Sequence, residues 1–360
     1  MAKLTAISGL GGKGPACFML ETAAARIMLD LGYGPQPGLL PDVAGVGQVD
    51  ALLLSHSHRD HAGGLALRPA LGNPPVYASD IGRRLLRGSV DSNSLPLRGM
   101  TDVLGIKVTT GRSGHAPGGV WLHLAVGGGL LYMGDNCAES LIYANDEPPA
   151  ARVVIADCSY GTYDTPLSAV IPTFNAILDA GPVLLPIPVA GRGPEIALHV
   201  LRSGRGEPAI DDAMRDSLAK LTADDHACLK PGVRDELARL AASARAINDN
   251  PSGIMLAGVA DAASGEAARL VERWEHSTSP AIVFTGYVPP GTPAARLTES
   301  GRASYRRWNV HPLLSENVSL ARAAGAEIVL PAFGDAARCR QDWATAFAPA
   351  RVITAGAVEI

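Results

Sequence analysis

The 360-residue sequence has few cysteines and no long apolar run, and each scarcity excludes a class of protein. The five cysteines are odd in number and scattered without a Cys-x-x-Cys pair, which disfavours a disulfide framework and favours a reducing compartment. No stretch of about 18 apolar residues occurs, and residues 1–8 lack the apolar core of a signal peptide. We therefore expect a cytoplasmic protein that neither spans a membrane nor is secreted.

The sequence also lacks a large excess of positive or negative charge. The formal net charge is −4 and there is no long basic run, so overall electrostatics do not indicate nucleic-acid binding. Most basic residues are arginines, which suit bidentate contacts to phosphate but also reflect a biased composition. A nucleic-acid substrate therefore stays open at this level.

The most informative segment places three histidines and an aspartate within six residues, directly after the apolar stretch 51–54. These residues are His56, His58, Asp60 and His61. Imidazole nitrogens and carboxylate oxygens are ligands that zinc accepts. On a loop that leaves a strand, His56 and His58 project together and can hold one ion, whereas Asp60 and His61 lie past the bend and can reach a second. A solvated polar loop would need this spacing to arise by chance.

Two later segments add further ligand types. His115 stands alone in a turn rich in glycine and proline, where it cannot be a core histidine of a helix. Asp135 follows the short apolar strand expected at 130–133, and Asp30 ends the one expected at 26–30. Taken alone, each aspartate could simply cap a turn or helix.

In type and order these residues resemble the metallo-β-lactamase superfamily. The resemblance implies two adjacent metal sites: His56, His58 and His115 for the first ion, Asp60 and His61 for the second, and Asp135 between them. It also implies that Asp30 holds in place the loop that carries His56, His58 and His61, called the histidine loop below. One or two Zn²⁺ ions are expected, with Mn²⁺ as the alternative.

Four further segments resemble the β-CASP branch of that superfamily, whose members process RNA or DNA. They are Val153–Gly161, Pro186–Glu195, Ile282–Thr292 and Val310–Pro312. The resemblance implies that His311 is the general acid, that Asp157 positions its imidazole, and that Arg192 and Tyr160 contact the substrate. For Arg192, a surface salt bridge with Glu195 is an equally good interpretation.

One position departs from the branch. The strand expected at 328–332 runs into Phe333-Gly334-Asp335, where the branch has a histidine that completes the second metal site. An aromatic ring cannot ligate zinc, so the second ion would keep Asp60, His61 and Asp135 unless water or Asp335 substitutes. Alternatively Phe333 is a core residue of a shifted alignment, but no histidine follows His311.

The glycine-rich segment Gly9–Gly14 suggests a phosphate-binding loop at first sight. That motif needs serine or threonine after its lysine, and here Gly14 follows Lys13. We interpret the segment as a turn between the first two strands.

The order of expected elements predicts an α/β fold: an αββα metallo-β-lactamase sandwich with an inserted small parallel α/β domain of the β-CASP type. Residues 17–20 and 26–30 are expected to form a hairpin of buried strands. Residues 1–165 are expected to form the first part of the sandwich, 166–300 the insertion, and 301–360 the segment that completes the sandwich.

The predicted function is that of a metal-dependent phosphodiesterase, most simply a ribonuclease of RNA processing that uses metal-bound hydroxide. In that role Asp60 would orient the nucleophile. Two alternatives stay open: a small-molecule metallohydrolase acting on thioesters, lactones or phosphoesters, and a non-catalytic RNA-binding protein. The sequence also leaves open RNA against DNA, endo- against exonuclease action, and a homodimer.

Overall fold

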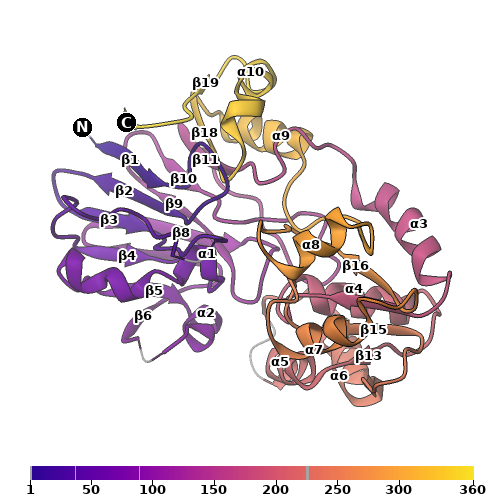
Figure 1. The fold of residues 1–360 in the computed structure, drawn as a ribbon. Coiled ribbons are helices and arrows are strands. Elements are labelled where there is room, and N and C mark those ends of the chain that lie inside the picture. The colour runs from indigo at the N-terminus through magenta and orange to yellow at the C-terminus, as the bar shows by residue number, and fades with distance from the viewer. Residues whose placement is uncertain (1, 37, 89, 224–226) are drawn as a thin grey trace. The chain divides into compact units, whose positions relative to one another are not determined.

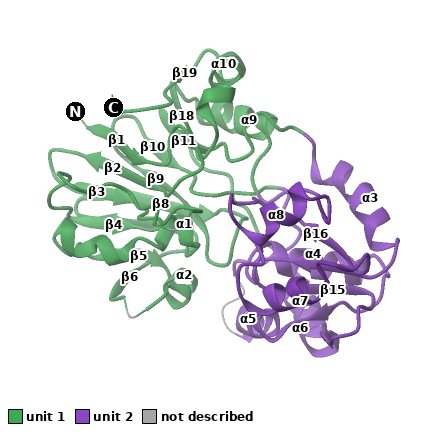
Figure 2. Cartoon of the chain, viewed as in Figure 1, with its two compact units in different colours: residues 1–138, 144–164, 311–360 green, residues 139–143, 165–310 purple. Residues whose placement is uncertain are grey.

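The computed structural model describes the chain except for residues 1, 37, 89 and 224–226, and the chain forms two compact units (Figure 1, Figure 2). Unit 1 comprises residues 1–138, 144–164 and 311–360, and unit 2 comprises residues 139–143 and 165–310. The chain returns from unit 2 to unit 1 after residue 310, ten residues later than the boundary expected at 300. The reason is that the strand Ala303–Tyr305 pairs with a strand of unit 2. Among the described residues, no helix is long and apolar enough to cross a membrane.

Unit 1 contains two seven-stranded sheets, each with parallel and antiparallel neighbours. In spatial order the first sheet consists of β20 (Ala357–Glu359), β1 (Lys3–Ser8), β2 (Cys17–Glu21), β3 (Arg26–Leu29), β4 (Ala51–Leu53), β5 (Val76–Ser79) and β6 (Ser92–Leu95). The second consists of β19 (Arg351–Val352), β18 (Ile328–Ala332), β11 (Val153–Asp157), β10 (Leu130–Tyr132), β9 (Val120–Leu124), β8 (Ile106–Arg112) and β7 (Gly99–Val103). The predicted hairpin of buried strands is β2 and β3, which pair antiparallel.

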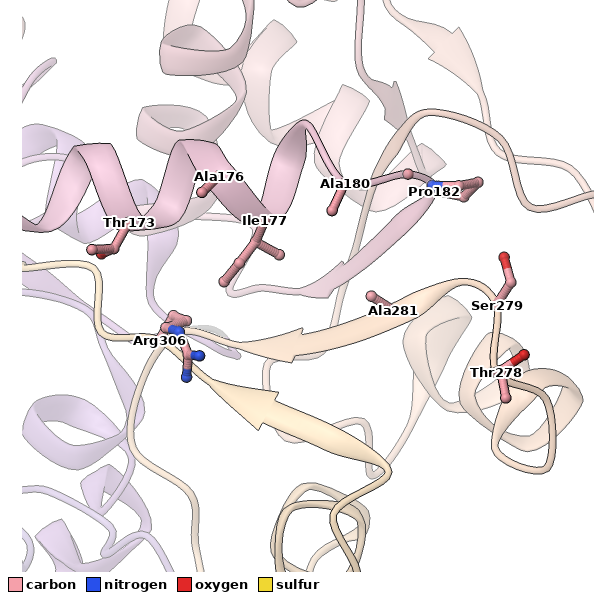
Figure 3. A pocket seen from close by; sticks show the side chains of 10 residues that line it. Thr173, Ala176, Ile177, Ala180, Pro182, Thr278, Ser279, Ala281 and Arg306 are labelled. Atoms are coloured by element: carbon pink, nitrogen blue, oxygen red, sulfur yellow. The ribbon is translucent and has the colours of Figure 1, made fainter.

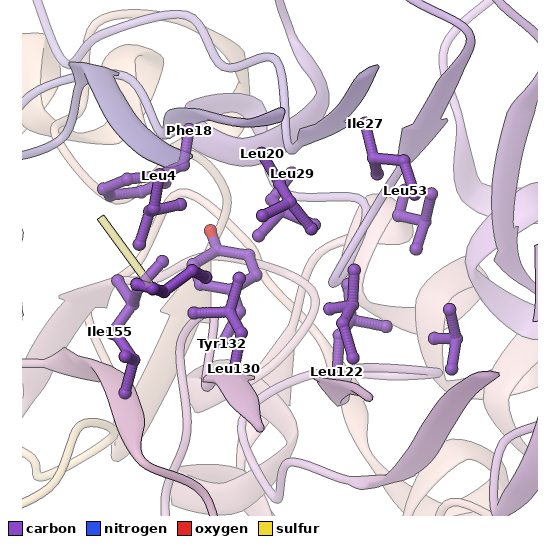
Figure 4. Packing of buried hydrophobic residues seen from close by; sticks show 14 of the residues in the cluster. Leu4, Phe18, Leu20, Ile27, Leu29, Leu53, Leu122, Leu130, Tyr132 and Ile155 are labelled. Atoms are coloured by element: carbon purple, nitrogen blue, oxygen red, sulfur yellow. The ribbon is translucent and has the colours of Figure 1, made fainter. Parts of the chain in front are cut away.

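The two sheets face each other across one apolar core (Figure 4). Phe18 and Leu20 of β2 enter this core with Leu122, Leu130 and Tyr132 of the second sheet. The alternate side chains of β2 lie in a second cluster on the outer face of the first sheet, because successive residues of a strand point to opposite faces. Burial on both faces explains why these strands are continuously apolar.

Helical segments cover the outer faces. On the first sheet these are α1 (Arg59–Ala62), the 3₁₀ helix Leu65–Leu71 and α2 (Asp80–Leu85), and on the second α9 (Leu314–Ala324) and α10 (Ala336–Ala346). The outer cluster of the second sheet includes Trp343 of α10 and Ala321 of α9. The predicted αββα sandwich is confirmed.

Unit 2 contains one six-stranded sheet in which every pair of neighbours is parallel. Its strands, in spatial order, are β14 (Arg245–Ala246), β13 (Ala209–Ile210), β15 (Ile254–Ala257), β12 (Val183–Pro186), β16 (Ala281–Phe284) and β17 (Ala303–Tyr305). Its helices are α3 (Leu167–Leu178), α4 (Arg192–Arg202), α5 (Asp212–Ala223), α6 (Val233–Ser243), α7 (Gly265–Trp274) and α8 (Pro293–Glu299). The inserted parallel α/β domain is thus confirmed.

Glu195 of α4 is a buried carboxyl that joins three segments of unit 2. Its Oε1 accepts a hydrogen bond from the Ser140 hydroxyl, and its Oε2 accepts one of 3.0 Å from Trp308 Nε1. Only 2 % of the residue is exposed, and burial raises the pKa of Glu195 to about 7 despite these donors. The carboxyl anchors the short segment 139–143 to α4.

This carboxyl makes the stability of unit 2 depend on pH. Because the pKa of Glu195 is near 4.5 in an unfolded chain and about 7 in the folded one, the folded state binds more protons between those values. The free energy of unfolding of the wild type should therefore fall as pH rises from about 5 to 7. This fall should be steeper than that of Glu195→Gln by on the order of 1 kcal/mol per pH unit. Urea unfolding of both proteins across this range measures the difference. The control Glu299→Gln removes an exposed carboxylate and should keep the pH dependence of the wild type. An equal pH dependence of the unfolding free energy in all three proteins would contradict a raised pKa of Glu195.

Candidate metal centre

The candidate ligands lie where strands of unit 1 end. His56 and His58 follow β4, and His61 lies in α1. Asp135 follows β10, and Asp157 is the last residue of β11. The ends of neighbouring strands thus deliver side chains from distant parts of the sequence to one place.

A glycine allows the histidine loop to fold closely against the chain after β3. A Cβ atom on Gly32 would lie 1.9 Å from the backbone oxygen of Asp60. That oxygen accepts a hydrogen bond of 2.8 Å from the backbone of Ala16. Any larger residue at position 32 would displace α1 and the ligands it carries.

The first cluster consists of His56, His58, His115 and Asp135, whose ligating atoms all lie within 4.8 Å of one another. His115 Nε2 lies 3.1 Å from His58 Nδ1 and 3.5 Å from Asp135 Oδ2. His56 Nε2 is buried and has no hydrogen-bond partner. Burial lowers the pKa values of His56 and His58, and neighbouring histidines lower that of His56 further, so both imidazoles are neutral as ligation requires. These residues fit a zinc-type ion.

Asp135 is shared by three clusters. The second cluster adds Asp60 and His61, and the third adds Asp157 and His311. Burial opposes the charge of Asp135, but His61 and His311 hold its pKa well below the usual value. An ionised carboxylate therefore stands at the middle of the centre, in the place expected for a bridging ligand.

Asp30 ties the histidine loop to the rest of unit 1. Its Oδ1 accepts a hydrogen bond of 2.7 Å from the Ser55 backbone, and its Oδ2 accepts one of 2.6 Å from the Ser55 hydroxyl. The same Oδ2 lies 2.7 Å from His61 Nδ1 and accepts a bond from the Tyr132 hydroxyl. A proton on His61 Nδ1 leaves Nε2 for a metal, and Nε2 lies 3.1 Å from Asp135 Oδ1.

His311 and Asp157 form a hydrogen-bonded pair beside Asp135. His311 Nδ1 lies 2.8 Å from Asp157 Oδ2 and 3.8 Å from Asp135 Oδ2. The Tyr160 ring lies edge-on to the His311 ring, at 5.1 Å between centroids. The backbone of Asn136 also donates to Asp157 Oδ2, at 3.2 Å, so the carboxylate that faces the imidazole is itself held in place.

The second cluster differs from the first because an aromatic ring and a lysine lie beside it. The Phe333 ring is buried and lies 5.1 Å from the His61 ring, between centroids. Asp335 does not take the missing ligand's place: it is exposed and caps α10 by accepting a hydrogen bond from the Arg338 backbone. Lys13 instead reaches this cluster, with Nζ at 3.2 Å from Asp60 Oδ2.

The sequence interpretation did not place Lys13 near the centre. A lysine within a glycine-rich turn gives no periodic or metal-ligand signal, so the pattern alone did not connect it with Asp60. The usable signal was the combination of that isolated lysine with the missing histidine at position 333.

Arg192, the expected substrate contact, is the first residue of α4 in unit 2. Its Nη1 donates a hydrogen bond of 3.0 Å to the Thr285 backbone oxygen. A Cβ atom on Gly286 would lie 2.1 Å from Arg192 Nη2, so the glycine leaves room for the guanidinium. The carboxylate of Glu195 meets Ser140 and Trp308, as described above, and the role of Arg192 stays a prediction.

A pocket lies within unit 2 (Figure 3). Its lining is formed by small and apolar residues with one arginine: Thr173, Ala176, Ile177, Ala180, Gly181, Pro182, Thr278, Ser279, Ala281 and Arg306. This lining offers no carboxylate, imidazole or thiol. Among the described residues, the clusters that could hold a metal ion lie in unit 1 and not in this pocket.

Comparison with known proteins agrees with this geometry. Residues 10–157 match the family model of the metallo-beta-lactamase superfamily. A structure of a protein of unknown function from Enterococcus faecalis superposes with a TM-score of 0.62, covering 100 % of both chains at 12 % identity. At that identity the likeness shows the fold alone.

Several curated relatives are similar over part or most of the chain. Transcription termination factor FttA of Cenarchaeum symbiosum is 28 % identical over 56 % of this chain and 39 % of its own length. Endoribonuclease YSH1 of Saccharomyces cerevisiae is 26 % identical over 81 % of this chain and 47 % of its own. An RNase J-like protein of Methanocaldococcus jannaschii is 26 % identical over 53 % of both. The chain spans about half the length of the curated relatives it matches.

The first cluster should hold a metal ion. Purified protein loaded with zinc or manganese is expected to retain at least one ion per chain, and His115→Ala should lose most of it because one of three imidazoles is gone. Metal analysis after dialysis measures both. His276→Ala, which removes an exposed histidine, is the control and should bind as wild type does. No retained metal in the wild type after reconstitution would disprove the site.

Asp30 should act on metal affinity through His61. Asp30→Asn turns a hydrogen-bond acceptor into a group that also donates, so the affinity for metal should fall by roughly 10- to 100-fold. Competition with a chromogenic chelator measures the dissociation constant, on protein shown to be folded by circular dichroism. Asp50→Asn removes a carboxylate that accepts from the exposed backbone of Arg26 and should change nothing. Unchanged affinity in Asp30→Asn would show that the network only supports the fold.

Proposed function

Because this chain has a metallo-beta-lactamase superfamily domain and β-CASP-type relatives, we propose that it is a metal-dependent phosphodiesterase that cleaves RNA. Two of those relatives carry the names endoribonuclease and RNase J-like protein, and a third is a transcription termination factor. All three names concern RNA or its synthesis.

The observation that carries the proposal is the His311–Asp157 pair beside the first cluster. The hydrogen bond of 2.8 Å to Asp157 places a proton on His311 Nδ1 and leaves Nε2 to exchange a proton with substrate. The imidazole lies 3.8 Å from Asp135, which belongs to all three ligand clusters. A proton donor beside a metal centre is what departure of a ribose oxygen requires.

The residues of the centre divide the remaining work. His56, His58, His115 and Asp135 would hold the ion, which when bound lowers the pKa of water and polarises a phosphoryl oxygen. Asp60 would accept a hydrogen bond from the attacking water and so orient it. Burial opposes the charge of Asp60, yet Lys13 and His61 keep its pKa at about 2, so the carboxylate is ionised at neutral pH.

We expect Tyr160 to pack against the substrate beside His311, and Arg192 to bind a phosphate. A guanidinium at the start of a helix favours anions for two reasons, its own charge and the helix dipole. The contact between the Tyr160 and His311 rings supports the first assignment, and the place of Arg192 at the start of α4 supports the second.

Substrate class is tested directly by turnover. The zinc- or manganese-loaded protein is expected to cleave labelled RNA, to act less on single-stranded DNA, and to lose activity when a chelator is added. Gel analysis of the products separates endonuclease from exonuclease action. Hydrolysis of a thioester or lactone with no cleavage of RNA would favour a small-molecule hydrolase instead, and binding of RNA without any cleavage would favour the non-catalytic alternative.

The role of His311 is tested by comparing two leaving groups. His311→Ala should retain metal but lose roughly 10²- to 10⁴-fold in turnover on RNA, the usual contribution of a positioned acid. A nitrophenyl phosphodiester needs little protonation of its leaving group, so the variant should be far less impaired on it.

Asp157→Asn should show the same selectivity more mildly, because it disturbs the orientation and charge of the imidazole and does not remove it. Steady-state rates on both substrates, with metal content measured in parallel, give the comparison. Equal losses on the two substrates, together with a lower melting temperature, would assign His311 a structural role.

A further inference from the structure

The second cluster lacks an expected ligand and has a cation beside it. Phe333 stands where the resemblance leads us to expect a ligand histidine, and it meets His61 with its ring at 5.1 Å between centroids. Lys13 Nζ lies 3.2 Å from Asp60 Oδ2 and 5.8 Å from the centroid of the Phe333 ring. Phe333 and Lys13 suit each other, since an aromatic face attracts an ammonium but cannot ligate a metal ion.

The position of Lys13 is built into the fold. In the loop that carries it, the Gly9 backbone oxygen accepts a hydrogen bond of 2.8 Å from the Phe333 backbone, and the Gly11 oxygen accepts one of 3.1 Å from Ala336. After the lysine, Ala16 donates to the Asp60 backbone oxygen at 2.8 Å. The loop is thus tied both to the segment that carries Phe333 and to the helix that carries Asp60.

The charges around Lys13 match those that a second ion would neutralise. The ammonium faces the carboxylate of Asp60, whose oxygen lies within 4.8 Å of a carboxylate oxygen of Asp135 in the same cluster. Only 21 % of the lysine side chain is exposed. A divalent ion bound by Asp60 would have to displace this ammonium or share the cluster with a like charge at short range.

We propose that the Lys13 ammonium takes the place of the second metal ion, so that the centre works with one ion and one fixed cation. In this arrangement Lys13 keeps Asp60 in position and supplies the second positive charge beside a phosphoryl oxygen. The proposal deepens the proposed function, since it assigns the cations of the same site. The composition of the centre can nevertheless be measured without any substrate.

The test counts ions in matched variants. Wild type, Lys13→Met, Phe333→His and the double variant are equilibrated with zinc, and metal per chain and the affinity of each ion are measured by mass spectrometry and calorimetry. Wild type and Lys13→Met should hold one ion. Phe333→His should bind a second ion weakly, and the double variant should bind it at least about tenfold more tightly, because the competing charge is gone.

Two further double variants control for side effects. Lys13→Arg with Phe333→His keeps a cation and should resemble Phe333→His alone. Lys107→Met with Phe333→His removes an exposed lysine of β8 and should also resemble it. Retention of the first ion shows in each case that the centre has folded.

Three results would overturn the inference. They are two firmly held ions in the wild type, an equally tight second ion in Phe333→His with Lys13 present, and no second ion in the Lys13→Met/Phe333→His protein while the first is retained. None of them involves RNA, so a failure here is distinguishable from a failure of the proposed nuclease activity.

Discussion

The carboxylate of Asp30 is hydrogen-bonded to groups from three parts of unit 1, and the geometry of the candidate metal centre depends on those bonds. It accepts from the backbone and hydroxyl of Ser55 and from the Tyr132 hydroxyl, and it faces His61 Nδ1. Asp30 is fully buried and has a φ of +58°, a backbone conformation that aspartate tolerates better than most residues. A buried carboxylate without these partners would be costly, so the loop, α1 and β10 are held in one arrangement.

That arrangement explains how one carboxylate can serve several ligand clusters. Asp135 follows β10, the strand that carries Tyr132, so the network around Asp30 also sets the position of Asp135 relative to His61. Asp157 approaches the same carboxylate from the end of β11, and His311 approaches it from the segment that precedes α9. Preorganisation of this kind lowers the cost of ordering the site when an ion or substrate binds.

Much of the fold and of the site followed from local sequence. The continuous apolar runs of β2 and β3 predicted buried strands, and the alternation of strands and helices after residue 165 predicted the parallel sheet of unit 2. The polar strand β6 (Ser92–Leu95) was not predicted, because its pairing with β5 decides its conformation more than its own residues do. Similarly, Ala303–Tyr305 belongs to unit 2 through its pairing with β16, which no local pattern indicates.

The sequence by itself determined the candidate ligand types and their order, because His56, His58, Asp60 and His61 lie within six residues and the later candidates follow recognisable strands. Only the tertiary structure decided what surrounds them. Lys13 lies in the loop between β1 and β2, Asp60 in α1 and Phe333 directly after β18. The contacts of Lys13 with the other two arise only when these segments pack together. Electrostatic and aromatic interactions act over a few ångströms in space whatever the separation along the chain, so residue spacing alone did not place Lys13 beside Asp60.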